Sequence, residues 1–104
     1  MNDVLSCQSW AFITTNQSSK YINRLCRHFS HKVDAEWEDD HGVIYFSIGR
    51  CGLSAEDAGL RIRCDAPDNE QLEELMEVVK SHFDRFAAQD GLDLTWSASP
   101  ATHL

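Results

Sequence analysis

The chain has 104 residues, of which 42% are hydrophobic and 25% charged, and its formal net charge is −8 at pH 7. This length fits one domain that buries about 65% of its unfolded surface. We expect residues 9–97 to form the folded core and residues 98–104 a loose tail. The negative charge disfavours nucleic acid as a partner, because contacts with phosphates dominate that affinity.

No apolar run approaches the roughly 18 residues that cross a bilayer, so we expect no membrane association. The first residues, MNDVLSCQSW, lack the basic start and apolar core of a signal peptide. The four cysteines, Cys7, Cys26, Cys51 and Cys64, match no zinc or redox spacing, and no C-x-x-C is present. The expected location is therefore the cytoplasm, with reduced thiols that behave as small buried hydrophobes.

Residues 9–15 (SWAFITT) are predicted to form a strand, and the polar cluster at residues 16–19 offers a helix N-cap. A helix is then predicted over residues 20–32, because apolar side chains recur there at steps of three and four residues. These side chains are Tyr21, Ile22, Leu25, Cys26 and Phe29.

From residue 33 the apolar period changes to two, which is typical of strands with one face in water. Residues 33–38 and 43–48 form a predicted hairpin around the turn at residues 39–42. A short strand over residues 50–53, a polar turn over residues 54–59 and a further strand over residues 60–65 follow.

The sequence Pro67-Asp68-Asn69 predicts the start of a second helix, capped by Asp68 or Asn69, and Asp90-Gly91 predicts its end. Leu92, Leu94 and Trp96 then alternate with polar residues, which predicts a last strand. The expected order is β-α-β-β-β-β-α-β, with short links that make the middle strands antiparallel.

Charged residues dominate the outward strand positions: Asp34, Glu36, Glu38, Arg61, Arg63 and Asp93. One face of the sheet is therefore expected to stay wet, with both helices on the other. The predicted fold class is α+β, a two-layer sandwich with a mainly antiparallel sheet. An exposed edge strand could pair with a second copy in a homodimer.

The stretch LCRHFSHK, residues 25–32, draws attention because it combines a cysteine, two histidines and several cations. On the first helix His28 shares a row with Tyr21, and on the second His82 shares a row with Leu72, Leu75, Val79 and Phe86. Two helices on one sheet face would bring His28 and His82 within reach. The candidate ligand-binding residues are Tyr21, His28, His31, His82 and Arg85.

Several interpretations stay open at this stage. The histidines could be hydrogen-bonded core residues, ligands of a transition metal, or part of a small-ligand or acid–base pocket. Candidate metal ligands are His28, His31, His41 and His82. A basic first helix could instead dock a protein partner through Lys20, Arg24, Arg27 and Lys32. No phosphate loop, H-E-x-x-H or nucleophile motif is present, which favours a role without catalysis.

The residues that carry a family resemblance are Tyr21, residues 25–32, Asp40-His41-Gly42, Gly49-Arg50-Cys51, residues 82–87 (HFDRFA) and Trp96. Together they resemble the bacterial domain-of-unknown-function family 2218, from about Thr15 to Trp96. The family has no established activity, and some members are joined to, or lie beside, siderophore-interacting flavin reductases. The resemblance implies an accessory binding module connected with iron or siderophores. The alternatives are a metal-binding protein or small enzyme that uses His28 and His82, and a purely structural interaction domain.

Overall fold

The computed structural model describes residues 7–97. The predicted tail at residues 98–104 lies outside them. The strands and helices are β1 (Cys7–Thr14), α1 (Ser18–Phe29), β2 (Asp34–Trp37), β3 (His41–Phe46), β4 (Gly49–Glu56), β5 (Gly59–Ala66) and α2 (Asn69–Ala87), followed by the 3-10 turn η1 (Ala88–Asp90).

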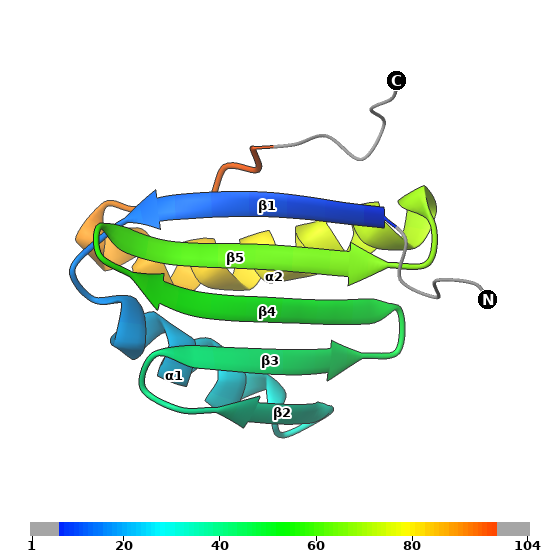
Figure 1. Cartoon of the computed structure of the whole chain (residues 1–104), viewed down its shortest axis with the longest axis horizontal. Helices are drawn as coiled ribbons and strands as arrows, with labels where there is room; N and C mark the ends of the chain where they lie inside the picture. Colours follow the sequence, from blue (N-terminus) through cyan, green and yellow to red (C-terminus); the bar gives the residue numbers. More distant parts are fainter. Residues whose placement is uncertain (1–6, 98–104) are drawn as a thin grey trace.

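The strands form one sheet in the order β1-β5-β4-β3-β2, and every neighbouring pair is antiparallel. Strands β2 to β5 follow one another as a meander, and β1 joins the free side of β5. Both helices lie behind the same face of the sheet (Figure 1). This architecture confirms the predicted α+β sandwich with one face open to water.

The core lies between the two layers. Alternation in the strands turns Ala11, Ile44, Leu53 and Ile62 inward, where each is at most 3% exposed. The helices cover them with their apolar rows, including Tyr21, Ile22, Leu25, Leu72, Leu75, Val79 and Phe83. Neither helix within residues 7–97 is long and apolar enough to span a membrane.

Local sequence signals fix the start of α2 and the end of the 3-10 turn η1 that follows it, both close to the predicted positions. The Asp68 carboxylate accepts a hydrogen bond of 2.8 Å from the Gln71 backbone N–H, as a helix N-cap does. At the other end Gly91 has a φ of 71°, a left-handed conformation that glycine adopts without steric cost. The first helix is shifted by comparison: it begins at Ser18 and ends at Phe29, rather than spanning residues 20–32.

The last predicted strand is reduced to a single antiparallel bridge between Ala11 and Trp96. Side chains of α2 form hydrogen bonds with the backbone groups that a longer strand would use for pairing. The Asp84 carboxylate accepts from the Leu94 N–H at 2.8 Å, and the Lys80 ammonium donates to the Leu94 carbonyl at 2.7 Å. The terminal segment is therefore tied to the helix as much as to the sheet edge.

The predicted turn over residues 54–59 was wrong. Strand β4 continues to Glu56, and only Asp57 and Ala58 separate it from β5. Polar Ser54 and Glu56 point to the wet face and pair with β5 residues, so their polarity marks an outward position rather than the end of a strand.

Candidate functional site

The imidazole rings of His28 and His82 meet where α1 crosses α2. Their centroids lie 4.9 Å apart and the rings are tilted by 43°. Phe29 lies 4.8 Å from the His82 ring, and Phe86 lies 5.5 Å from the His28 ring. The two histidines are therefore part of an aromatic cluster that joins the helices.

A backbone hydrogen bond sets the orientation of His82. Its Nδ1 lies 2.8 Å from the Val78 carbonyl oxygen, one turn earlier in α2. A carbonyl oxygen can only accept, so Nδ1 carries the proton and Nε2 holds the lone pair of the neutral ring. His82 is half-buried, whereas His28 is exposed at the rim of the cluster.

The pKa of His28 is lowered below the ordinary value for histidine. Partial desolvation against the ring cluster is the largest cause, followed by repulsion from the charge that His82 and His31 carry when protonated and from the charges of Lys32 and Arg85. The neutral form is favoured, so His28 offers a lone pair or a hydrogen bond rather than a charge.

This shift predicts a stability that falls as the pH falls from 7.5 to 5.5. Unfolded His28 binds its proton at the ordinary pKa of 6.5, and the folded state resists that proton. The contribution is complete above the unfolded pKa and is lost as the pH falls through the folded pKa. In urea unfolding at several pH values, His28→Gln should flatten this dependence.

His41 provides the opposite control. Its pKa is raised, mainly by a hydrogen bond to the Asp40 carboxylate, so its contribution exists below the unfolded pKa and is lost as the pH rises. His41→Gln should therefore steepen the fall in stability toward acid. Equal slopes for the wild type and His28→Gln would show that the His28 environment does not disfavour protonation.

A shallow groove runs along the exposed side of this cluster. Its volume is about 410 Å³, and it is lined by Asn23, Arg24, Arg27, His28, His31 and Phe86. These residues define the α1–α2 groove. The Arg24 guanidinium lies 5.0 Å from the centre of the Phe86 ring, close enough for a cation–π contact. The groove thus combines hydrogen-bond donors and positive charge with one aromatic wall.

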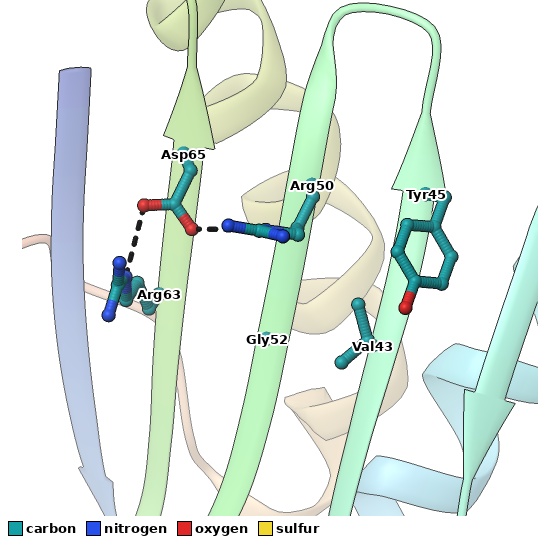
Figure 2. Close-up of a pocket in the computed structure, with 6 residues that line it drawn as sticks. All are labelled: Val43, Tyr45, Arg50, Gly52, Arg63 and Asp65. Carbon is teal, nitrogen blue, oxygen red and sulfur yellow. Dashed lines mark hydrogen bonds and ion pairs between the residues drawn. The ribbon is translucent and has the colours of Figure 1, made fainter. Parts of the chain in front are cut away.

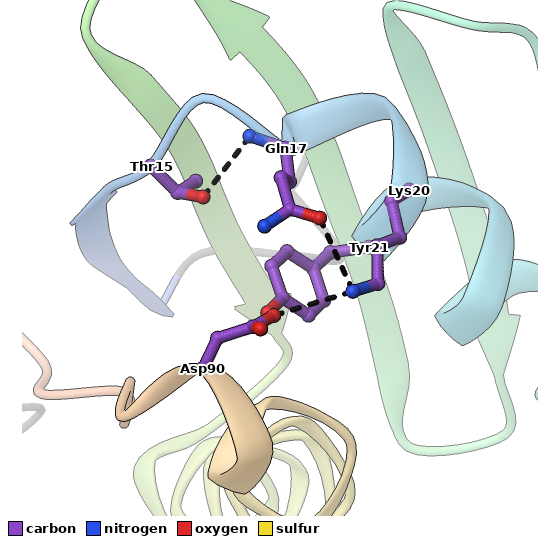
Figure 3. Close-up of polar contacts among 5 residues, drawn as sticks. All are labelled: Thr15, Gln17, Lys20, Tyr21 and Asp90. Carbon is purple, nitrogen blue, oxygen red and sulfur yellow. Dashed lines mark hydrogen bonds and ion pairs between the residues drawn. The ribbon is translucent and has the colours of Figure 1, made fainter.

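Tyr21 does not reach the groove. It is fully buried, and its hydroxyl donates to the Asp90 carboxylate, which also accepts from the Lys20 ammonium at 3.3 Å (Figure 3). Burial and the Asp90 carboxylate raise the pKa of Tyr21 to about 12. The contact ties α1 to the turn after α2, which is a structural role.

Tyr21→Phe should lower the free energy of unfolding by about 1–2 kcal/mol, because it removes a hydrogen bond to a charged acceptor that can regain water. Urea unfolding at pH 7 measures this. Tyr45→Phe is the matched control, since Tyr45 is 42% exposed and should change stability by less than about 0.5 kcal/mol. Equal losses would contradict the role given to the Tyr21 hydroxyl.

The four candidate metal ligands do not assemble. His41 lies at the start of β3, and its Nδ1 contacts the Asp40 carboxylate at 2.8 Å. Within residues 7–97, no group of three or more His, Cys, Asp or Glu side chains could hold a metal ion. Arg85 is exposed and does not line the groove, although its charge reaches His28.

The open face of the sheet carries a second polar surface that sequence reasoning missed. Asp65 is only 3% exposed there, because Arg63 and Arg50 lie over it. The Nε atoms of these arginines lie 3.0 Å and 3.6 Å from its carboxylate oxygens (Figure 2). The alternating stretch R-I-R-C-D, residues 61–65, places Arg63 and Asp65 on one face, but it does not reveal Arg50 as their neighbour.

Two adjoining hollows lie beside these charges, with volumes of about 250 and 360 Å³. They share Val43, Gly52 and Arg63. Tyr45 lines the first, and Trp10 and His41 line the second. The hollows on the open face are thus a second concave polar surface besides the α1–α2 groove.

The chain is a two-layer α+β domain built on a five-stranded antiparallel sheet. Residues 10–97 match DUF2218, described as uncharacterised proteins conserved in bacteria, and the chain belongs to this family. It is also similar to the NMR structure of PA4090 from Pseudomonas aeruginosa, with a TM-score of 0.73 and 29% identity. That match covers 90% of this chain and 98% of the other. No curated protein matches the chain.

Proposed function

We propose that the protein is a non-catalytic binding module that takes a small anionic ligand in the α1–α2 groove. One observation carries this proposal: the chain has a net charge of −8, yet the cations Arg24 and Arg27 converge with the ring donors of His28 and His31 on one groove. Positive charge concentrated in a concavity attracts anions and holds them by charge-assisted hydrogen bonds.

The groove divides the contacts between two kinds of chemistry. Arg27 on α1 and His31 in the turn after it are exposed donors, suited to carboxylate, phosphate or phenolate oxygens. Arg24 and Phe86 form a stacked pair that offers a flat surface to the rest of the ligand. Neutral His28 completes the floor.

The proposed setting is cytoplasmic iron or siderophore handling, as the family resemblance implies. Two features support it: the groove arginines suit the anionic oxygens of catecholate compounds, and all four cysteines are free.

Isothermal titration calorimetry on protein without a His tag tests the proposal. The probes are citrate, inorganic phosphate, and iron-loaded and iron-free catecholate siderophores. At least one should bind, and Arg27→Glu should weaken it at least about tenfold, because an attractive charge becomes a repulsive one. Lys20→Glu is the matched control, since Lys20 lies on α1 but outside the groove. Unchanged binding in Arg27→Glu, or no binding of any probe, would overturn the proposal.

The second candidate is a metal site on His28 and His82, favoured by the 4.9 Å separation of their rings. A transition metal held by the pair would need further ligands. Elemental analysis of untagged protein distinguishes the two functions. Stoichiometric zinc, iron or nickel that disappears in His82→Ala would support the metal site; its absence, with no thermal stabilisation by these ions, would exclude it.

A further inference from the structure

The register of the sheet places a glycine at the centre of the open face. Gly52 of β4 is paired with Val43 of β3 on one side and with Arg63 of β5 on the other. Trp10 of β1 is paired with Arg63 in turn. Gly52 is therefore the one position without a side chain in a row that reads Trp10, Arg63, Gly52, Val43.

Nothing in the fold requires glycine at this position. Among the described glycines, only Gly49 and Gly91 have a positive φ, so Gly52 does not need the conformational freedom of glycine. A Cβ atom built on Gly52 would meet nothing within 4 Å. Glycine weakens the interior of a strand, and it often marks a place where a ligand or another backbone approaches closely. No backbone covers Gly52, so the space above it is open to a ligand.

Asp65 holds two arginine side chains in place beside Gly52 before any ligand binds. Asp65 directs the guanidinium groups of Arg50 and Arg63 toward itself through their Nε atoms, and both arginine side chains remain 45% exposed. Figure 2 shows Asp65 between the two arginines, with Gly52 on the adjacent bare stretch of β4. The terminal nitrogens of each guanidinium are left to donate elsewhere. Two arginines and one carboxylate leave a net charge of +1, which suits a monoanion.

Apolar and aromatic side chains form the walls nearest Gly52, and the second hollow is also lined by His41, Ser54 and Arg61. Tyr45 and Val43 of β3 flank one side of Gly52 in Figure 2, and Trp10 lines the adjoining hollow. Tyr45 is the one large hydrophobic side chain in the described part of the chain that is exposed, at 42%. A floor of bare backbone between such walls accommodates a flat ring better than a branched or globular ligand. A cavity of about 150 Å³ already holds benzene, so these hollows, at about 250 and 360 Å³, have room for one or two rings.

We propose that the hollow over Gly52 is a second binding site, for a planar aromatic monocarboxylate. The ring lies on the Gly52 backbone between Val43 and the aromatic rim, and the carboxylate accepts hydrogen bonds from Arg50 and Arg63. This site is separated from the α1–α2 groove by the sheet and the core, and it does not rest on the function proposed for that groove.

Isothermal titration calorimetry with 2-naphthoate as the probe tests the proposal. The wild type should bind, and Gly52→Val should weaken binding at least about tenfold, because the valine side chain occupies the floor on which the ring lies. Valine suits a strand and has open space at this position, so the thermal midpoint of Gly52→Val should equal or exceed that of the wild type. 2-Naphthamide, which keeps the rings but lacks the charge, should bind at least about tenfold more weakly than 2-naphthoate.

The groove variant Arg27→Glu distinguishes the two sites. Arg27→Glu disfavours any 2-naphthoate in the groove, so in this background the remaining binding should persist and should weaken at least about tenfold when Gly52→Val is added. Arg50→Gln tests the same site from its charged side. It should weaken the binding of 2-naphthoate, while Arg63 still pairs with Asp65 at 3.0 Å. No binding to the wild type at millimolar 2-naphthoate, full binding to folded Gly52→Val, or a Gly52→Val protein that does not fold would each overturn the proposal.

Discussion

Phe83→Ala should lower the free energy of unfolding by about 3–5 kcal/mol, the largest loss expected from a single truncation in this chain. The Phe83 ring is fully buried on α2, and its centroid lies 5.2 Å from that of Tyr21 on α1. The substitution removes the apolar surface of the ring and leaves a cavity that two helices fixed to one sheet cannot readily close. Urea unfolding at pH 7, followed by circular dichroism, measures the loss.

Phe12→Ala is the matched control. Phe12 undergoes the same chemical change, but it is half-exposed on the open face, where its ring contacts the Arg61 guanidinium at 5.2 Å. Its loss should stay below about 2 kcal/mol, because the ring is only partly removed from water. If both variants lost the same stability, the core between the layers would not be where the buried residues place it.

Gly59→Ala is expected to have the second-largest effect, a loss of about 3 kcal/mol. Gly59 begins β5 opposite Thr14 of β1, and an added Cβ would lie 2.1 Å from the Ile13 carbonyl oxygen. The clash is with backbone, so no rotation of a side chain relieves it. Thermal and urea unfolding should both show the loss.

Gly52→Ala separates this clash from the general effect of alanine in a strand. Gly52 has open space above it, and alanine there should leave stability unchanged or raise it by about 0.5–1 kcal/mol. A Gly59→Ala variant as stable as Gly52→Ala would mean that β1 and β5 are not packed as closely as their pairing requires.

The layers of the fold were predictable because each inward row is encoded locally. The helix rows through Leu25 and Leu75 and the alternation around Ile62 need no knowledge of distant residues. Two predictions were wrong where polar side chains do not follow this local pattern. Lys80 and Asp84 bind the backbone of Leu94 from a helix, and the polar end of β4 is strand rather than turn.

The candidate sites also contain a part that is predictable from local sequence and a part that is not. The helix rows predict that His28 and His82 can meet, and their rings do lie 4.9 Å apart. Tyr21 shares the row of His28, but seven residues place it about 10 Å away along the helix, next to Asp90. The cluster of Arg50, Arg63 and Asp65 depends on which residues of β4 and β5 face each other, and strand register is a long-range property.

The position of β1 has a consequence for the order of folding. Strands β2 to β5 need only tight turns to pair with one another. Strand β1 instead pairs with β5, and even its nearest pair in the sequence, Thr14 with Gly59, is separated by α1 and strands β2 to β4. Closing such a long loop costs conformational entropy before any contact rewards it. The meander and its helices are therefore expected to assemble first and β1 to dock last. Its backbone amides should then exchange with deuterium sooner than those of β4, which hydrogen-exchange measurements on the native protein can show.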